Sequence, residues 1–159
     1  MVRTIKVVGV SGCGKSTLLR LFMEKHPGFS SMSYGEFLAK YGKNSDEQWQ
    51  KMLAQNENIV IIDDHLEWGD RDFVSLYRKE NTLAILLITA DPQNILSRRM
   101  ADQTRLRDLD IETLEKEQEV SRRRAFHIAD RLAIPIYELH DASIDESVST
   151  LEQIIHEVG

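Results

Sequence analysis

The residues with the clearest chemical meaning lie near the start of the chain. Residues 9–17 read GVSGCGKST and fit the phosphate-loop pattern G-x-x-x-x-G-K-[ST]. Glycines let such a loop bend tightly, so that successive backbone N–H groups converge on anionic oxygens. Lys15 would reach the β- and γ-phosphates of a nucleoside triphosphate, and the Ser16 hydroxyl would bind Mg²⁺. We therefore predict that ATP is held by Gly9, Ser11, Gly12, Cys13, Gly14, Lys15, Ser16 and Thr17.

The elements on either side of this loop are those that the pattern requires. An apolar run containing Ile5, Val7 and Val8 precedes the loop, and a helical pattern begins near Lys15. The amino terminus of that helix would add its unpaired N–H groups and the positive end of its dipole. The sequence thus predicts a strand, a phosphate loop and a helix in succession.

Composition limits the class of protein. The chain has 159 residues, 42% of them hydrophobic and 29% charged, as expected for one domain spanning residues 1–159. The net charge of −6 argues against a nucleic-acid partner, and no apolar run is long enough to span a membrane. We expect small-molecule substrates as partners, and no feature indicates a protein partner.

Cys13 is the single cysteine of the chain. One cysteine excludes an internal disulfide framework and fits a reducing compartment, so we predict a cytoplasmic location. Its place in the phosphate loop allows a redox-sensitive thiol, but a small residue that fits a crowded turn is the more common role.

Strand and helix signals alternate along the chain. We expect strands at residues 4–10, 29–32, 59–62, 82–89 and 134–139. Helices are expected at about 15–26, 33–42, 45 onward, 70–80, 91 onward, 111–133 and 143 onward. Ser33, Ser45 and Ser143 each begin a helix-start pattern. The alternation predicts an α/β fold with three layers, in which helices cover both faces of a parallel sheet.

Arginine is concentrated in the second half of the chain. Eight of the twelve arginines lie between residues 98 and 131, namely Arg98, Arg99, Arg105, Arg107, Arg122, Arg123, Arg124 and Arg131. Guanidinium groups bind phosphate oxygens bidentately, so residues of about 99–124 could form a lid over the phosphates. The alternative is a solvated helix pair with i,i+4 ion pairs, because acidic residues are nearly as frequent there. Our candidates are Arg99, for ATP binding, with Arg105, Arg107 and Arg122.

Two adjacent carboxylates end the strand expected at residues 59–62. Asp63 and Asp64 lie where a carboxylate could support the metal ion in this architecture, and Asp63 is favoured for that role. Either residue could instead cap the turn. His65 follows on the same rim, where a histidine is more often structural than a base.

Taken together, these motifs resemble the nucleoside monophosphate kinase family of P-loop kinases, and the chain is most similar to archaeal-type adenylate kinase. The resemblance is carried by residues 9–17, 33–35, 63–65, 102–109 and 118–123. It implies a P-loop kinase fold with a five-stranded parallel sheet, a short acceptor-binding segment at about 33–57 and an arginine-rich lid. It also implies Mg²⁺-dependent transfer of the γ-phosphoryl group of ATP to AMP. By position, the catalytic residues would be Lys15, Arg105, Arg107 and Arg122. The loop at residues 140–143, which includes Ser143, would lie near the donor adenine.

The acceptor segment departs from the family pattern. Residues 29–62 contain no arginine to grip the phosphate of AMP, and their cations are Lys40, Lys43 and Lys51. The acceptor-binding residues that we expect are Gly35, Asp64, His65 and Arg71. Two replacements for the missing arginine are open: Arg71 takes its place, or Arg99 and Arg122 hold the acceptor phosphate from the other side.

Three functions follow from these observations. The leading hypothesis is a kinase acting on AMP or a related nucleoside monophosphate. The second is a small-molecule kinase with a hydroxyl acceptor, for which Asp63, Asp64 or Asp70 could serve as base. The third is a slow ATPase that acts as a nucleotide-dependent switch or assembly factor.

Overall fold

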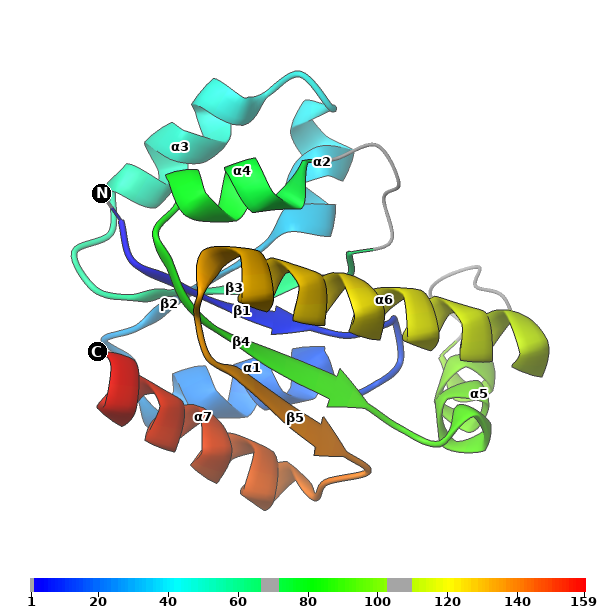
Figure 1. Ribbon diagram of the computed structural model, residues 1–159. Helices are drawn as coiled ribbons and strands as arrows, with labels where there is room; N and C mark the ends of the chain where they lie inside the picture. Colours follow the sequence, from blue (N-terminus) through cyan, green and yellow to red (C-terminus); the bar gives the residue numbers. More distant parts are fainter. Residues whose placement is uncertain (1, 67–71, 103–109) are drawn as a thin grey trace.

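Five parallel strands form the sheet on which the site is built (Figure 1). The computed structural model describes residues 2–66, 72–102 and 110–159. In the sheet the strand order is β2-β3-β1-β4-β5. The strands are β1 (Thr4–Val8), β2 (Ser30–Ser33), β3 (Val60–Asp64), β4 (Thr82–Thr89) and β5 (Ile136–His140). The predicted parallel sheet is confirmed.

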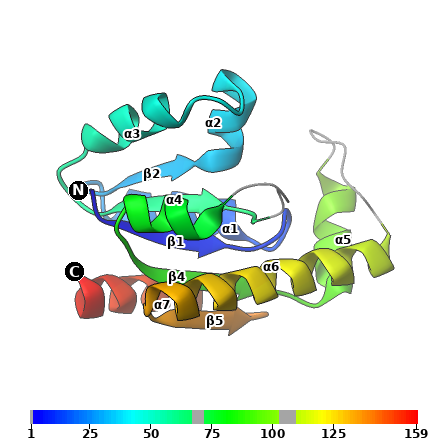
Figure 2. The ribbon, with the colours of Figure 1, turned by 45° about the horizontal axis from the view of Figure 1, so that its top comes forward.

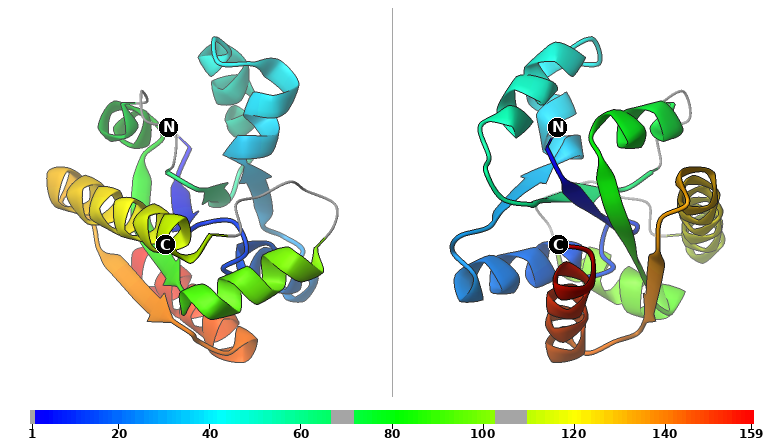
Figure 3. Two further views of the ribbon diagram at one scale, coloured as in Figure 1. Left: turned by 90° about the vertical axis from the view of Figure 1, so that its right-hand side faces the viewer. Right: turned by 60° about the vertical axis from the view of Figure 1, so that its left-hand side comes forward.

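Helices cover both faces of the sheet (Figure 3). They are α1 (Lys15–Lys25), α2 (Tyr34–Tyr41), α3 (Asp46–Ala54), α4 (Phe73–Lys79), α5 (Pro92–Ala101), α6 (Ile111–Leu132) and α7 (Ile144–Val158). One face packs against α1 and α7, for example through Phe22 and Leu151. The other face packs against α4 and α6, with Tyr77 and Ile128 in that core. This is the three-layer α/β fold that the sequence predicts.

The segment from α2 to α3 forms a third apolar cluster at the β2 edge of the sheet (Figure 2). Trp49 and Leu53 of α3 and Phe37 of α2 pack there against Val60 and Ile62 of β3. This cluster places the predicted acceptor segment beside the carboxyl ends of β2 and β3.

Two of the three serine helix starts are capped as expected. Ser33 Oγ accepts a hydrogen bond from the N–H of Glu36 at 3.3 Å, and Ser143 Oγ accepts one from Glu146 at 3.1 Å. Ser45 marks the start of α3 correctly, but its side chain does not cap that helix. Its hydroxyl instead donates to the carbonyl of Gly42, because the tight turn before α3 brings this carbonyl within reach.

The remaining boundaries differ from the expected ones by a few residues. Helix α4 begins at Phe73, where Asp72 accepts a hydrogen bond from the N–H of Ser75 at 3.1 Å. Of the predicted lid, residues 103–109 lie outside the described residues, and the rest belongs to α5, α6 and the residues that cap them, Asp102 and Asp110. In the described part of the chain, no helix is both long and apolar enough to cross a membrane.

Candidate active site

The loop between β1 and α1 has the tight backbone that phosphate binding needs. Gly12 and Gly14 have φ angles of 91° and 106°, which side chains rarely tolerate. Gly9 is required for space, because a Cβ there would lie 2.6 Å from both Cys13 Sγ and the Ile88 carbonyl oxygen. The loop therefore depends on three glycines for two different physical reasons.

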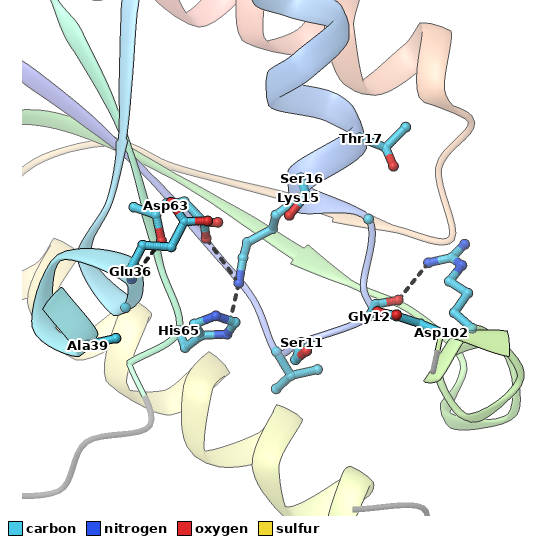
Figure 4. A pocket seen from close by; sticks show the side chains of 15 residues that line it. Ser11, Gly12, Lys15, Ser16, Thr17, Glu36, Ala39, Asp63, His65 and Asp102 are labelled. Atoms are coloured by element: carbon cyan, nitrogen blue, oxygen red, sulfur yellow. Dashed lines mark hydrogen bonds and ion pairs between the residues drawn. The ribbon is translucent and has the colours of Figure 1, made fainter. Parts of the chain in front are cut away.

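Lys15 lies at the centre of the site and is buried, with 4% of its surface exposed. Its Nζ donates to the carbonyl of Gly9 and lies 3.3 Å from Asp63 Oδ1. The same atom is 3.1 Å from Nδ1 of His65 (Figure 4). The structure thus brings together three of the predicted residues, Lys15, Asp63 and His65.

The two adjacent carboxylates at the end of β3 point in opposite directions, because side chains alternate along a strand. Asp63 lines the cavity beside the phosphate loop. Asp64 accepts hydrogen bonds from the N–H of Leu66 and from the hydroxyl of Tyr77, both at 3.1 Å. Asp64 is therefore directed to the α4 side of the sheet, where it holds the turn after β3, and not to the cavity as we expected for an acceptor ligand.

Ser16 and Asp63 fit a magnesium ion. Both line the cavity, and Asp63 Oδ1 is buried and accepts no hydrogen bond from the described residues. Mg²⁺ prefers oxygen ligands and, beside phosphates, typically keeps several waters and one or two protein groups. In the described residues there is no cluster of three or more histidine, cysteine or acidic side chains suited to a metal ion. The donor set is that of a cation held mainly by phosphates and water.

The main cavity has a volume of about 590 Å³ and joins the phosphate loop to the start of α2. Gly35 and His65, predicted to bind the acceptor, line it. Sequence reasoning missed Ser33, Glu36, Ala39, Arg98 and Asp102, which also line it. The capping box at Ser33 was a usable signal for Glu36, because a box places its fourth residue on the first turn of the helix.

Neighbouring arginines of α5 have different roles. Arg99 is 5% exposed, and its Nε donates to the carbonyl of Ser11 at 2.9 Å while a terminal nitrogen pairs with Glu117 at 2.9 Å. Arg98 is exposed, donates to the carbonyl of Gly12 at 3.1 Å and lines the cavity. We predicted Arg99 as an ATP ligand, but its contacts tie the loop to α6, and Arg98 is the arginine that faces the cavity.

The consecutive arginines of α6 diverge, as helical geometry requires. Arg122 pairs with Glu138 of β5 at 2.9 Å, and this hydrogen bond raises the pKa of the Arg122 guanidinium above its ordinary value. Arg123 forms an i,i+4 pair with Glu119. Arg124 donates to the carbonyl of Leu66.

Of the predicted catalytic arginines, Arg122 is the one that lies within the described residues. Arg122 does not line the main cavity, and Arg123 fits the ion-pair alternative. Arg71, Arg105 and Arg107 lie outside the described residues. Their roles stay predictions.

A smaller cavity of about 240 Å³ lies on the other side of the phosphate loop. Asp141 and Ala142, from the loop expected near the donor adenine, line it together with Thr17 and Arg98. Asp141 accepts a hydrogen bond from the N–H of Asp91, which lowers the pKa of the Asp141 carboxyl. Ser143, predicted as an ATP ligand, instead caps α7, and the loop meets the cavity through its two preceding residues.

Cys13 also lines this smaller cavity, but its thiol is buried. Burial raises the pKa of the Cys13 thiol, which disfavours the reactive thiolate. The small-residue interpretation therefore fits Cys13 better than a redox role.

Comparison with known proteins finds one matching family model and several adenylate kinases at low sequence identity. The model of the family described as AAA domain matches residues 8–116. The adenylate kinase of Thermoplasma acidophilum is 26% identical, with 94% of this chain and 96% of that protein covered. The adenylate kinase of Pyrobaculum aerophilum is 29% identical, with 79% and 78% covered. The Thermoplasma alignment extends over 184 positions, more than the 159 residues of this chain, so that relative has residues that this chain lacks.

Solved structures support the fold. The YorR protein of Bacillus subtilis, in complex with phosphorylated GDP, has a TM-score of 0.67 at 17% identity, covering 96% of this chain and 95% of its own. A shikimate kinase from Bacteroides thetaiotaomicron has a TM-score of 0.59 at 18% identity, with 98% of both chains covered. At these sequence identities the structural matches support the fold but not a shared function. The chain belongs to the AAA domain family and is a P-loop kinase, an ATP-dependent phosphotransferase similar to archaeal adenylate kinases.

Proposed function

We propose that this protein transfers the γ-phosphoryl group of ATP to a nucleoside monophosphate, with AMP as the leading acceptor. The observation that carries the proposal is that one continuous cavity, of about 590 Å³, joins the phosphate loop to the start of α2. Ligand pockets typically measure about 300–1,000 Å³, so this cavity has room for the reacting ends of two substrates. The adenylate kinase relatives match along most of the chain, which favours AMP.

On the donor side, the loop N–H groups and the amino terminus of α1 would hold the phosphates of ATP. Lys15, which lines this cavity, would turn from Asp63 and His65 toward the transferring group. Mg²⁺, when bound, would neutralise phosphate charge, with Ser16 and Asp63 as its protein ligands. A monophosphate acceptor is already anionic, so positioning and electrostatic stabilisation suffice and no base is needed.

On the acceptor side, Gly35 and His65 form part of the cavity wall. No arginine occurs in residues 29–62, so the acceptor phosphate needs cations from elsewhere. Arg98 faces the cavity from α5. Arg71, Arg105 and Arg107 are the other candidates, outside the described residues.

The test is a coupled assay with ATP and Mg²⁺ against AMP, CMP, UMP, GMP and dTMP. We expect AMP to be the best acceptor and Lys15→Ala to lower kcat by roughly 10²–10³-fold, as loss of one transition-state contact does. Lys25→Ala is the matched control, because Lys25 is an exposed lysine of the same helix that pairs with Glu152. Failure of all five monophosphates to react faster than with Lys15→Ala would overturn the proposal.

A second candidate is a kinase with a hydroxyl acceptor. Among the described residues, carboxylates rather than guanidinium groups line the α2 end of the cavity, where Glu36 and Asp63 lie. Such a reaction needs a base, and Asp63 is the candidate that faces the cavity, whereas Asp64 does not and Asp70 lies outside the described residues. Phosphorylation of a hydroxyl compound, abolished in Asp63→Asn, without activity on monophosphates would favour this candidate. The slow-ATPase hypothesis stays a prediction.

A further inference from the structure

A second large cavity meets the main one at four oxygen-bearing side chains. It has a volume of about 560 Å³ and lies between α1 and β2. The residues that line both cavities are Ser16, Ser33, Glu36 and Asp63. They come from the start of α1, the end of β2, the first turn of α2 and the end of β3. Separate elements thus direct two hydroxyls and two carboxylates to one place.

One carboxylate oxygen of Asp63 lacks a hydrogen-bond donor among the described residues. The residue is 9% exposed, and its Oδ1 accepts no hydrogen bond from the described residues. Its ion-pair partner in that part of the chain is Lys15, at 3.3 Å. When Lys15 turns toward the phosphates of ATP, this contact weakens and leaves a buried carboxylate without its cation. A buried charge in that state is strongly unfavourable, so another cation must replace the lysine.

Glu36 is the second carboxylate at this place. Its side chain is exposed and makes no hydrogen bond or ion pair within the described residues. In Figure 4 the side chains of Glu36 and Asp63 extend into the same part of the cavity. Two carboxylates in one gap repel each other unless a cation lies between them.

We propose that Glu36 is a further oxygen donor for the divalent cation that Ser16 and Asp63 would hold. The cation would then connect the donor phosphates to α2, the first helix of the acceptor segment. The inference rests on the proposed ATP binding by the phosphate loop, but not on the identity of the acceptor.

The experiment compares ATP-analogue binding with and without the cation. A non-hydrolysable ATP analogue is titrated calorimetrically into the full chain in Mg²⁺ and, separately, in EDTA, and the ratio of the two affinities is the gain due to Mg²⁺. For Glu36→Gln we expect this gain to fall by about tenfold or more, the usual effect of losing a group that supports a metal ion. Binding in EDTA should stay equal or tighten, because a negative charge near the phosphates is removed.

The matched control is Glu24→Gln. Glu24 is an exposed carboxylate of α1 that lines only the second cavity and pairs with Arg20 at 3.4 Å. This variant should keep the wild-type gain, and Glu36→Asp, which preserves the charge, should keep part of it. An unchanged gain in Glu36→Gln, or an equal loss of affinity in Mg²⁺ and EDTA, would overturn the inference while ATP binding by the wild type stands. If the wild type itself bound no analogue, the proposed function would fail as well.

Discussion

At the scale of single residues, Gly9 shows how closely the phosphate loop packs. The loop leaves β1 beside β4, and a Cβ at Gly9 would meet the Ile88 carbonyl and Cys13 Sγ at 2.6 Å. Neither neighbour yields easily, because Ile88 is held in a central strand and Cys13 is buried. Packing in protein interiors is dense enough that even one added methyl group is felt. Gly9 therefore determines how near the loop lies to the sheet.

We expect Gly9→Ala to lower the free energy of unfolding by about 1–3 kcal/mol, the usual cost of overpacking. The displaced loop should also bind ATP more weakly. Gly28→Ala is the control, since nothing lies within 4 Å of a Cβ at Gly28, and its effect should stay within about 0.5 kcal/mol. Urea unfolding of both variants measures the difference, and equal stabilities would contradict the steric argument.

At the scale of elements, α5 and α6 together support the phosphate loop. Successive residues of a helix point about 100° apart, so Arg98 and Arg99 cannot serve the same surface. Arg99 fills the buried space between the loop and α6, where Glu117 receives it. Arg98 lines both the main cavity and the smaller cavity on the other side of the phosphate loop. One helix thus supplies a buried structural cation and a cavity-facing cation in adjacent positions.

Alanine substitutions of the two arginines should therefore affect different properties: Arg99→Ala the stability of the fold, and Arg98→Ala the binding of ATP. Arg99→Ala should cost about 2–4 kcal/mol of stability, because it leaves Glu117 and the Ser11 carbonyl without their buried partner. Arg98→Ala should change stability by less than about 0.5 kcal/mol. It should weaken ATP binding by about tenfold, the effect of losing one charged hydrogen bond.

Urea unfolding and calorimetric ATP titration measure both quantities. If Arg99→Ala kept its stability and lost ATP binding, Arg99 would be a ligand after all, as the sequence alone suggested.

At the scale of the whole molecule, a buried polar network joins the predicted acceptor segment to the centre of the sheet. Lys6 of β1 and Glu80 form an ion pair in which both side chains are 1% exposed or less. The Trp49 indole of α3 donates to the other oxygen of Glu80, and Lys6 lies 4.5 Å from the centroid of the Tyr77 ring. Each charge is thus compensated, and α3 is attached to elements distant in the sequence.

Removing one charge of the Lys6–Glu80 pair should destabilise the fold more than replacing both charges with apolar side chains. Glu80→Ala should cost about 3–5 kcal/mol, because the Lys6 ammonium stays buried without a counter-ion. The double variant Lys6→Met, Glu80→Leu removes both charges and should be closer to the wild type than Glu80→Ala. A double-mutant cycle based on urea unfolding, with Lys6→Met and Glu80→Leu as its two single variants, gives the coupling energy. Strictly additive effects would show that the pair is not coupled.

Much of the fold could be predicted from local patterns. The β-branched run before Asp63 indicated a buried strand, and Ser33 and Ser143 indicated helix starts that the structure confirms. Ser45 indicated the helix start correctly but not the cap, because a nearby carbonyl competes for its hydroxyl. Local hydrogen bonds and apolar periodicity are properties of adjacent residues, so a sequence can reveal them.

The phosphate loop and the alternation of strands and helices are determined by the sequence itself, since glycine conformation, helix dipoles and apolar periodicity all act over a few residues. The tertiary structure decided which neighbour of each pair reaches the site: Asp63 rather than Asp64, and Arg98 rather than Arg99. It also placed Glu36, Ser16 and Asp63 in the walls of the same two cavities. These choices depend on strand order and on which helix covers each face of the sheet. Both follow from contacts between distant parts of the chain, which local patterns do not encode.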